Sequence, residues 1–458
     1  MPAQRPIVLI HGYSDKGQSF KRWRDILVQN GYDADQVHIC TYQSLTNEVN
    51  IKDIAEAMDR ALRQRLGAGA EFDAIVHSTG MLVLRQWLVA HAARRGQLKR
   101  LIALAPATNG SPLAHRGRGL VGAIFKGSKR VGPDFLEAGD LVLDGLELGS
   151  RFTWDLTHRD LLGENPVFGK GGDTPYAFIF CGTTAYSGLR KLVNEPGMDG
   201  TVRWAGCALT TQKIVIDLTR DGPDRADADR FFLGNIAGQA TLPMPTWLID
   251  GLNHGTILLE PNERLIRLVT SALKVNNEAE FNAWSETARD ETGATSLNEQ
   301  KWQQFVMRAV DERGNPIDDY YVELFHLDAN GEAVPVDFDL DAHVYQGDRS
   351  LRCFHVDLTA LEDTLGTPMP PLWARVVATT GTRMVGYHGV NSERLPDLNG
   401  PENEDGVWSA VIPLPDTFDE GKIKLLYPYT TTFIELRLNR DPTPFGPTPS
   451  EVCLFIDT

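Results

Sequence analysis

The sequence predicts an α/β fold with a mostly parallel sheet and a cap insertion, followed by a C-terminal antiparallel β-sandwich. Three observations support this prediction. Short unbroken apolar runs alternate with helical patterns up to about residue 275, as in a parallel sheet with helical crossovers. Residues 115–172 interrupt that alternation. Beyond residue 300 the chain consists of short β-rich runs separated by turn-forming clusters.

The first half of the chain supplies the strands and helices of the parallel sheet. The run at 7–10 (IVLI) is a strand of the kind that is buried on both faces. Ser19 caps a helix, and a second helix from Ile51 to Leu62 has its apolar residues at helical spacing. Further strands are expected at 37–40, 72–76, 101–106, 176–181 and 244–249, although two prolines crowd the start of the last one, and a closing helix begins near Pro261.

The second half supplies short antiparallel strands. The run at 320–327 leads into DANG at 328–331, a strong hairpin signal. At least seven strands without a convincing helix indicate a β-sandwich. Residues 276–298 are polar and turn-rich, with Trp284 as an apolar exception. We therefore expect a first domain at 1–275, a partly helical linker at 276–298 and a sandwich domain at 299–458.

Composition sets limits on the class of protein. A chain of 458 residues exceeds one typical core, so two domains are expected. The net charge of −16 argues against non-specific nucleic-acid binding and against docking on anionic lipid. The sequence shows no signal peptide and no apolar run that is long enough for a membrane span. We therefore expect a cytoplasmic protein without stable membrane insertion, with secretion as the alternative.

The sequence predicts no metal site and no organic cofactor. Its five cysteines are widely spaced and contain no C-x-x-C pair, a pattern that indicates neither a zinc site nor a disulfide framework and leaves a single bridge as an alternative. Asp337, Asp339 and Asp341 alternate, so on a strand they would share one face. A solvated face is the expectation there, and a calcium site is the alternative.

The stretch VHSTG at 76–80 stands between an apolar strand and an apolar helix. A serine on so sharp a turn is lifted clear of both elements, and the following backbone N–H is free at the helix start. Ser78 is therefore a candidate nucleophile, with an ordinary strand-to-helix connection as the alternative. The stretch resembles the nucleophile elbow of the α/β-hydrolases, especially lipases and esterases with histidine before the serine. Val76 occupies a position where that motif usually has glycine, whereas Gly80 matches it.

Three further loops extend the resemblance over a little more than half of the chain. The HGY stretch at 11–13 resembles the loop of lipases that lines the oxyanion hole, which implies that the backbone N–H groups of Tyr13 and Thr79 are its donors. Asp199 follows the strand 176–181, and the resemblance implies that it is the acid of the triad. His254 follows the last strand, and the resemblance implies that it is the base. Their order in the chain is the one expected of this fold. Asp217 and Asp221 are the alternative acids, since an aspartate before glycine is by default a turn residue.

The insertion at about 107–172 resembles the segment that forms the cap in lipases. Its apolar residues at helical spacing, Leu120, Ile124 and Phe125, are expected to face acyl chains of the substrate. A surface excursion packed on the sheet edge is the alternative.

The resemblance implies serine-dependent hydrolysis of carboxylic esters with hydrophobic acyl groups, in the manner of lipases and esterases, polyesters being one candidate class. The alternatives are an acyltransferase or thioesterase on the same triad, and a non-catalytic binding protein on a hydrolase scaffold. The sequence predicts no particular oligomeric state.

Overall fold

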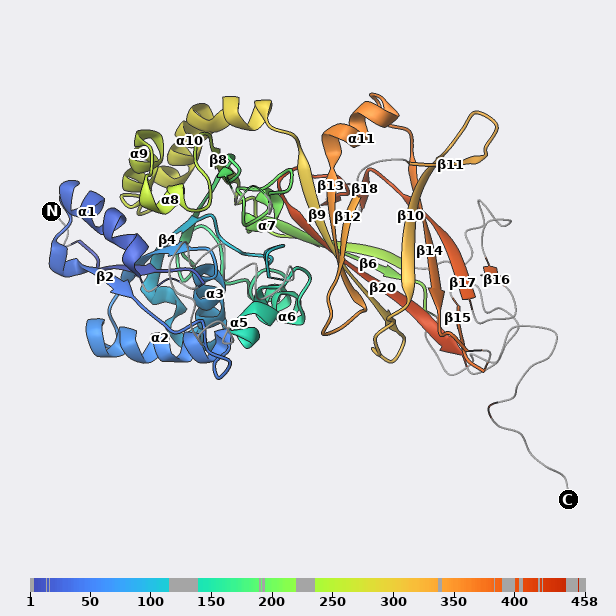
Figure 1. Cartoon of the computed structure of the whole chain (residues 1–458), viewed down its shortest axis with the longest axis horizontal. Coiled ribbons are helices and arrows are strands. Elements are labelled where there is room, and N and C mark those ends of the chain that lie inside the picture. Colours follow the sequence, from blue (N-terminus) through green and yellow to red (C-terminus); the bar gives the residue numbers. More distant parts are fainter. Residues whose placement is uncertain are drawn as a thin grey trace, which may run out of the picture. The chain divides into compact units, whose positions relative to one another are not determined.

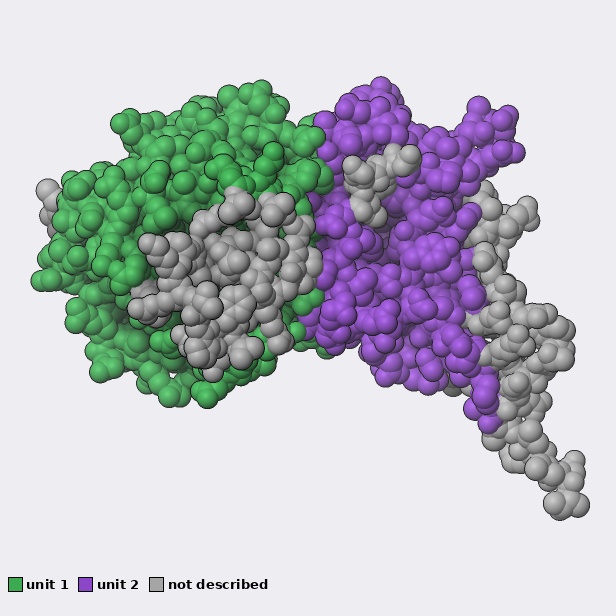
Figure 2. Space-filling view, viewed as in Figure 1, with its two compact units in different colours: residues 1–211, 241–302, 429–431 green, residues 212–240, 303–428, 432–458 purple. Residues whose placement is uncertain are grey.

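The computed structural model of the 458-residue chain consists of two compact units (Figure 2). The first comprises residues 1–211, 241–302 and 429–431, and the second comprises 212–240, 303–428 and 432–458. The structure describes all residues except 1–3, 14, 16, 115–138, 189–190, 192–193, 220–234, 337–339, 383, 389–399, 403–406, 419–420, 422, 442–451 and 453–458.

The first unit is built on a six-stranded sheet in the order β2-β1-β3-β4-β5-β8, and every neighbouring pair is parallel. All residues of β1, β3 and β5 are buried, because helices cover both faces of a parallel sheet. The parallel sheet predicted from the apolar runs is therefore confirmed. The strands are β1 (Ile7–Ile10), β2 (Val37–Cys40), β3 (Phe72–His77), β4 (Leu98–Leu104), β5 (Tyr176–Gly182) and β8 (Thr246–Ile249).

Helices lie on both faces of this sheet (Figure 1). α2 and α3 lie on one face, and α9 and α10 lie on the other. Helix α2 begins with a capping box, in which the Asn50 side chain accepts from the Asp53 N–H and the Asp53 carboxylate accepts from the Asn50 N–H. No helix in the described ranges has both the length and the apolar character that a bilayer span requires. The α-helices of the first unit outside the insertion, among the described residues, are α1 (Lys21–Gln29), α2 (Ile51–Leu66), α3 (Gly80–Ala90), α7 (Trp204–Cys207), α8 (Thr256–Leu259), α9 (Glu263–Ala272) and α10 (Glu278–Asn298).

The insertion after β4 contributes the helices α5 (Asp140–Leu146) and α6 (Arg151–Asp160). Arg85 on α3 forms a fully buried ion pair with Asp160, with Nε–Oδ2 and Nη2–Oδ1 distances of 2.7 and 2.9 Å. Its Nη2 also donates to the Thr157 hydroxyl at 3.0 Å. This paired, bidentate arrangement is what a buried guanidinium requires. It fastens α6 to the helix that follows Ser78.

Residues 276–298 differ from the expected linker, because 278–298 form α10 within the first unit. Trp284 on this helix packs edge-on against Phe178 and Phe180 of β5 and Trp247 of β8, with ring centroids 4.5, 6.0 and 5.8 Å away. A few large apolar contacts hold the helix on the sheet, and its remaining surface is polar. The sequence pattern is therefore weak although the packing is extensive.

The second unit is a β-sandwich. One sheet has the order β11-β10-β14-β17-β16, and the other has the order β12-β13-β9-β20-β6-β7 with β15 beside β20. Apolar side chains of both sheets share one core. The antiparallel sandwich predicted for the C-terminal part is therefore confirmed. The strands are β6 (Thr211–Asp217), β7 (Asn235–Ala240), β9 (Trp302–Asp311), β10 (Tyr320–Leu327), β11 (Ala333–Pro335), β12 (Leu340–Val344), β13 (Leu351–Asp357), β14 (Leu372–Thr379), β15 (Gly386–His388), β16 (Gly400–Glu402), β17 (Val407–Leu414) and β20 (Thr431–Asp441), with a separate hairpin of β18 (Thr417–Phe418) and β19 (Ile423–Lys424).

Two parts of this unit differ from the sequence-based expectation. The antiparallel strands β6 and β7, whose residues were expected in the first domain, belong to the second unit. The region beyond residue 300 also contains a helix, α11 (Leu358–Leu365), where only strands were expected. It is short, and its N-terminus is capped by the Asp357 carboxylate, which accepts from the N–H groups of Thr359 and Ala360.

Candidate active site

Ser78 lies in a strained turn between β3 and α3. Its φ of 53° is in the left-handed region, which costs a non-glycine residue about 1–3 kcal/mol. The surrounding structure holds the turn, since the Ser78 N–H donates to the Leu104 carbonyl at 3.3 Å and the Ser78 carbonyl accepts from the Ala107 N–H at 3.1 Å. A strained serine at this point of a sheet is the geometry of a nucleophile elbow.

Two glycines permit the close approach of other backbone to this turn. A Cβ on Gly80 would lie 2.6 Å from the Ile10 carbonyl oxygen and 2.7 Å from that of His11. A Cβ on Gly12 would lie 2.8 Å from the Ser78 Cβ. The loop after β1 therefore lies directly against Ser78, and side chains at these two positions would separate them.

Asp199 and His254 form a buried pair. The His254 Nδ1 lies 2.9 Å from Asp199 Oδ2, and both side chains are almost fully buried. The other carboxylate oxygen of Asp199 accepts from the backbone N–H groups of Thr201 and Val202 at 2.9 and 2.8 Å. Asp199 is thus both a turn residue and the partner of His254. Among the described residues, the His254 Nε2 is buried without a hydrogen-bond partner.

His77 links the loop of His254 to the turn of Ser78. Its Nε2 lies 3.0 Å from the His254 carbonyl oxygen, and the two rings are 4.5 Å apart. A carbonyl only accepts, so the His77 Nε2 carries the proton. Burial, and then the neighbouring His254, hold the pKa of His77 well below its ordinary value, so this imidazole is neutral. Sequence reasoning assigned His77 no role, although its place beside Ser78 was visible.

The loop at 11–13 is held by a second neutral histidine. The His11 Nδ1 lies 2.7 Å from the Gly12 carbonyl, and its Nε2 accepts from the Tyr42 N–H at 3.1 Å. The Tyr42 ring stacks on His11 with centroids 4.2 Å apart. Burial lowers the pKa of His11. Nothing in the spacing of the sequence pointed to Tyr42, which follows a different strand.

The two predicted oxyanion donors belong to segments that adjoin Ser78. Thr79 is the residue before α3, where backbone N–H groups have no intrahelical acceptor. Tyr13 follows Gly12, which contacts Ser78. Burial, and then the Asp140 carboxylate, raise the pKa of the Tyr13 phenol, so its ring stays neutral.

A pair of thiols lies behind the acid. The Cys181 Sγ is 3.8 Å from Asp199 Oδ2, and the Cys207 Sγ is 3.5 Å from the Cys181 Sγ. Both are free thiols. Burial is the main cause that raises the pKa of each thiol, so both are protonated and neutral. Their wide spacing in the sequence gave no sign of this contact.

Other residues named from the sequence lie elsewhere. Asp217 is on β6 in the second unit, where its carboxylate accepts from the Thr219 N–H at 2.9 Å. Several residues named from the sequence fall outside the described residues. They are the other alternative acid Asp221, the cap residues Leu120, Ile124 and Phe125, and the aspartates at 337 and 339. Asp199, Ser78 and His254 follow β5, β3 and β8 respectively. Loops at the carboxyl ends of parallel strands are where α/β sheets carry their sites.

No protein-family model and no curated protein sequence matches this chain. Solved structures do resemble it. Phospholipase PlaB from Legionella pneumophila in complex with thio-NAD matches with a TM-score of 0.75 and 22% identity, over 95% of this chain and 94% of that chain. A second PlaB structure gives the same TM-score and identity over 96% and 94%. Lipase BlEst2 from Bacillus licheniformis in its mature form matches at a TM-score of 0.39 and 16% identity, over 59% of this chain and 93% of that chain. At this identity the PlaB match shows a shared fold that extends over both units.

Proposed function

We propose that this chain, which has the α/β-hydrolase fold, is a serine-dependent carboxylic ester hydrolase with Ser78, His254 and Asp199 as its triad. The observation that supports this most is the buried Asp199–His254 hydrogen bond of 2.9 Å. It joins two loops at the sheet edge where the strained Ser78 turn also lies. A neutral imidazole whose Nδ1–H is held by a carboxylate presents its Nε2 as a base.

The proposed reaction is two-step acyl transfer. The Ser78 Oγ attacks the ester carbonyl carbon while the His254 Nε2 takes its proton, and the Asp199 carboxylate stabilises the imidazolium. The backbone N–H groups of Tyr13 and Thr79 hold the oxyanion. His254 then protonates the leaving alcohol as the carbon–oxygen bond breaks. Water attacks the acyl-enzyme, gives its proton to His254 and releases the carboxylic acid, and Ser78 regains its proton.

The proposed substrates are esters with hydrophobic acyl groups. Among these we place phospholipids first, because a structurally similar protein is described as a phospholipase, and we place glycerides and polyesters after them. A chain-length series of p-nitrophenyl esters tests the preference for hydrophobic acyl groups, and hydrolysis rates on a phospholipid and a triglyceride of the same acyl chain test the ranking. Activity on acetate with none on octanoate would contradict it.

The Ser78→Ala variant tests the nucleophile. We expect hydrolysis of p-nitrophenyl octanoate to fall by about 10⁴-fold or more, with thermal unfolding close to that of the parent protein. Ser285→Ala is the matched control, since the Ser285 hydroxyl lies on α10 and donates to the Phe281 carbonyl of the same helix. Turnover that survives in Ser78→Ala would remove Ser78 from the mechanism.

Two further measurements separate the alternatives. Labelling of Ser78 by a fluorophosphonate, absent in Ser78→Ala, is expected for a hydrolase and not for a non-catalytic binding protein. Product analysis with added alcohols and with thioester substrates then distinguishes hydrolysis from acyl transfer and from thioesterase activity. We expect free carboxylic acid as the main product.

A further inference from the structure

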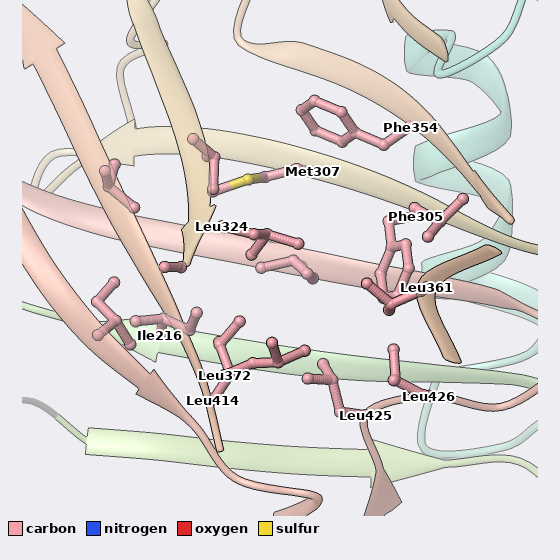
Figure 3. A pocket seen from close by; sticks show the side chains of 16 residues that line it. Ile216, Phe305, Met307, Leu324, Phe354, Leu361, Leu372, Leu414, Leu425 and Leu426 are labelled. Carbon is pink, nitrogen blue, oxygen red and sulfur yellow. The ribbon is translucent and has the colours of Figure 1, made fainter. Parts of the chain in front are cut away.

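The second unit contains an apolar cavity of about 110 Å³ between its two sheets (Figure 3). Sixteen side chains line it, and all of them are aliphatic, phenylalanine or methionine. The Met307 sulfur is the only heteroatom among them. Protein interiors are normally packed without voids of this size. An empty cavity therefore lowers the stability of the fold, whereas a bound apolar ligand would fill it.

The cavity follows from the alternation of the strands. Val322 and Leu324 on β10, and Phe305 and Met307 on β9, are spaced by two and point into it from the two sheets. On the central strand β14 the alternating position is Ala374, whose small side chain leaves space. Most of the cavity lining therefore comes from inward-facing strand positions of the sandwich, and Leu361 on α11 and residues 425 and 426 after β19 complete it.

The cavity is not fully enclosed by buried side chains. Leu324, Phe354 and Leu426 among its lining residues are only partly buried. A second hollow of about 260 Å³ shares Leu372 and Leu414 with it, together with residues 425 and 426. We call this second hollow the vestibule.

The vestibule has charged and polar side chains among its lining residues, which the cavity lacks. Lys424, Asp416 and Thr417 line it. Lys424 is exposed, and within the part of the chain that the structure describes its ammonium group forms no ion pair. An apolar interior with a cation at its mouth matches an amphiphile with a hydrocarbon chain and an anionic head group. Asp416 is the opposing charge at the same mouth.

We propose that this cavity binds the hydrocarbon chain of a free fatty acid, with the carboxylate in the vestibule beside Lys424. The choice of occupant rests on the proposed function, because ester hydrolysis releases a carboxylic acid. An apolar cavity of about 150 Å³ holds a benzene molecule, so about 110 Å³ accommodates the last four or five carbons of a chain. The rest of the chain crosses the vestibule, which points to medium-length fatty acids.

Calorimetric titration with hexanoate, octanoate and decanoate tests the proposal in the full-length Ser78→Ala protein, which removes catalysis. We expect saturable binding that tightens by about fourfold per added methylene until the cavity is filled. Ala374→Phe fills the cavity and is expected to weaken decanoate binding by about tenfold or more. Ala342→Phe is the matched control on β12, where Ala342 is exposed and lies outside the cavity.

The vestibule charges give a second, independent readout that leaves the core untouched. Lys424→Met should weaken decanoate binding about two- to fivefold and leave decanol unchanged, as expected for an exposed charge pair. Asp416→Asn should strengthen decanoate binding. Tighter binding of decylamine than of decanoate would overturn the assignment of the head group. This readout also applies if Ala374→Phe does not fold, which circular dichroism would show.

Absence of saturable decanoate binding, or binding that Ala374→Phe leaves unchanged in a folded protein, would overturn the proposal. The second result would place the ligand outside this cavity. Failure of the proposed function is a separate outcome, because the titration needs no turnover. The two outcomes are independent. A protein that hydrolyses no ester can still bind decanoate at this cavity, and an active esterase can show no decanoate binding there.

Discussion

The two units use space in opposite ways. At the Ser78 turn of the first unit there is no spare volume, since a single added carbon on Gly80 would meet the Ile10 carbonyl at 2.6 Å. Between the sheets of the second unit about 110 Å³ is left open by inward-facing apolar side chains. Residue identity around Ser78 is therefore dictated by close backbone approach, whereas the second unit requires only apolar alternation. Substitutions should consequently act in opposite directions in the two units.

The largest expected effect is a loss of ester hydrolysis in the first unit without a change in fatty-acid binding by the second. Asp199→Asn preserves the size of the acid but no longer favours the tautomer in which His254 Nδ1 carries the proton. We expect ester hydrolysis to fall by about 10⁴-fold, measured as kcat with p-nitrophenyl octanoate. Decanoate binding by the second unit should be unchanged. Activity within tenfold of the parent protein would mean that Asp199 is not the triad acid.

The buried Arg85–Asp160 pair offers the largest effect on stability. Arg85→Met leaves the fully buried Asp160 carboxylate without its cation, which costs about 3–5 kcal/mol in comparable buried pairs. We expect the free energy of unfolding of the first unit to fall by this amount. Urea titration measures it. The control is Arg151→Met, whose pair with Asp155 is exposed and should change stability by less than about 1 kcal/mol. Equal effects of the two variants would contradict the proposed importance of burial.

The neutral His77 predicts a pH dependence that belongs to the first unit. Burial and His254 depress its folded-state pKa, so below about pH 6.5 the unfolded chain binds a proton that the folded chain does not. Stability should therefore be complete above that pH and fall as pH decreases, by up to about 1.4 kcal/mol per pH unit for this one group.

His77→Gln tests this dependence, because glutamine retains a donor for the His254 carbonyl without titrating. The difference in unfolding free energy between parent and variant should change between pH 7 and pH 5. The parent protein should lose more stability than the variant over this interval. Parallel curves would show that His77 titrates normally in the folded protein.

The same contrast explains which features could be predicted from the sequence. The parallel sheet was predictable because β1, β3 and β5 are unbroken apolar runs. The Ser78 turn was predictable because its five-residue stretch VHSTG stands between an apolar strand and an apolar helix. Asp199 and His254 were placed by their position after strands, and the structure brings them into hydrogen-bond contact. Their roles as acid and base remain part of the proposal.

The missed features depend on contacts that local patterns do not encode. Strand β6 has Ile214 and Ile216 facing one side, but nothing in this alternation tells which sheet the strand joins. Helix α10 is held on the sheet by Phe281 and Trp284. The other buried positions on that face are small or polar, at Ala288, Thr292 and Thr295, so the apolar period is weak although the face is regular. Tyr42 and Cys181 reach the site through packing against residues distant in the sequence. Such partners become visible only when the sheet order is known.

The smallest expected effect has the opposite sign and tests the comparison directly. Ala374→Leu adds three carbons that point into the cavity, and filling an apolar void commonly raises stability by about 0.5–2 kcal/mol. We expect the free energy of unfolding of the second unit to increase by such an amount. Ala342→Leu adds the same atoms at an exposed position and should change it by less than about 0.5 kcal/mol. A loss of stability in Ala374→Leu would mean that the space between the sheets is already closed in solution, and the contrast with the Ser78 turn would no longer hold.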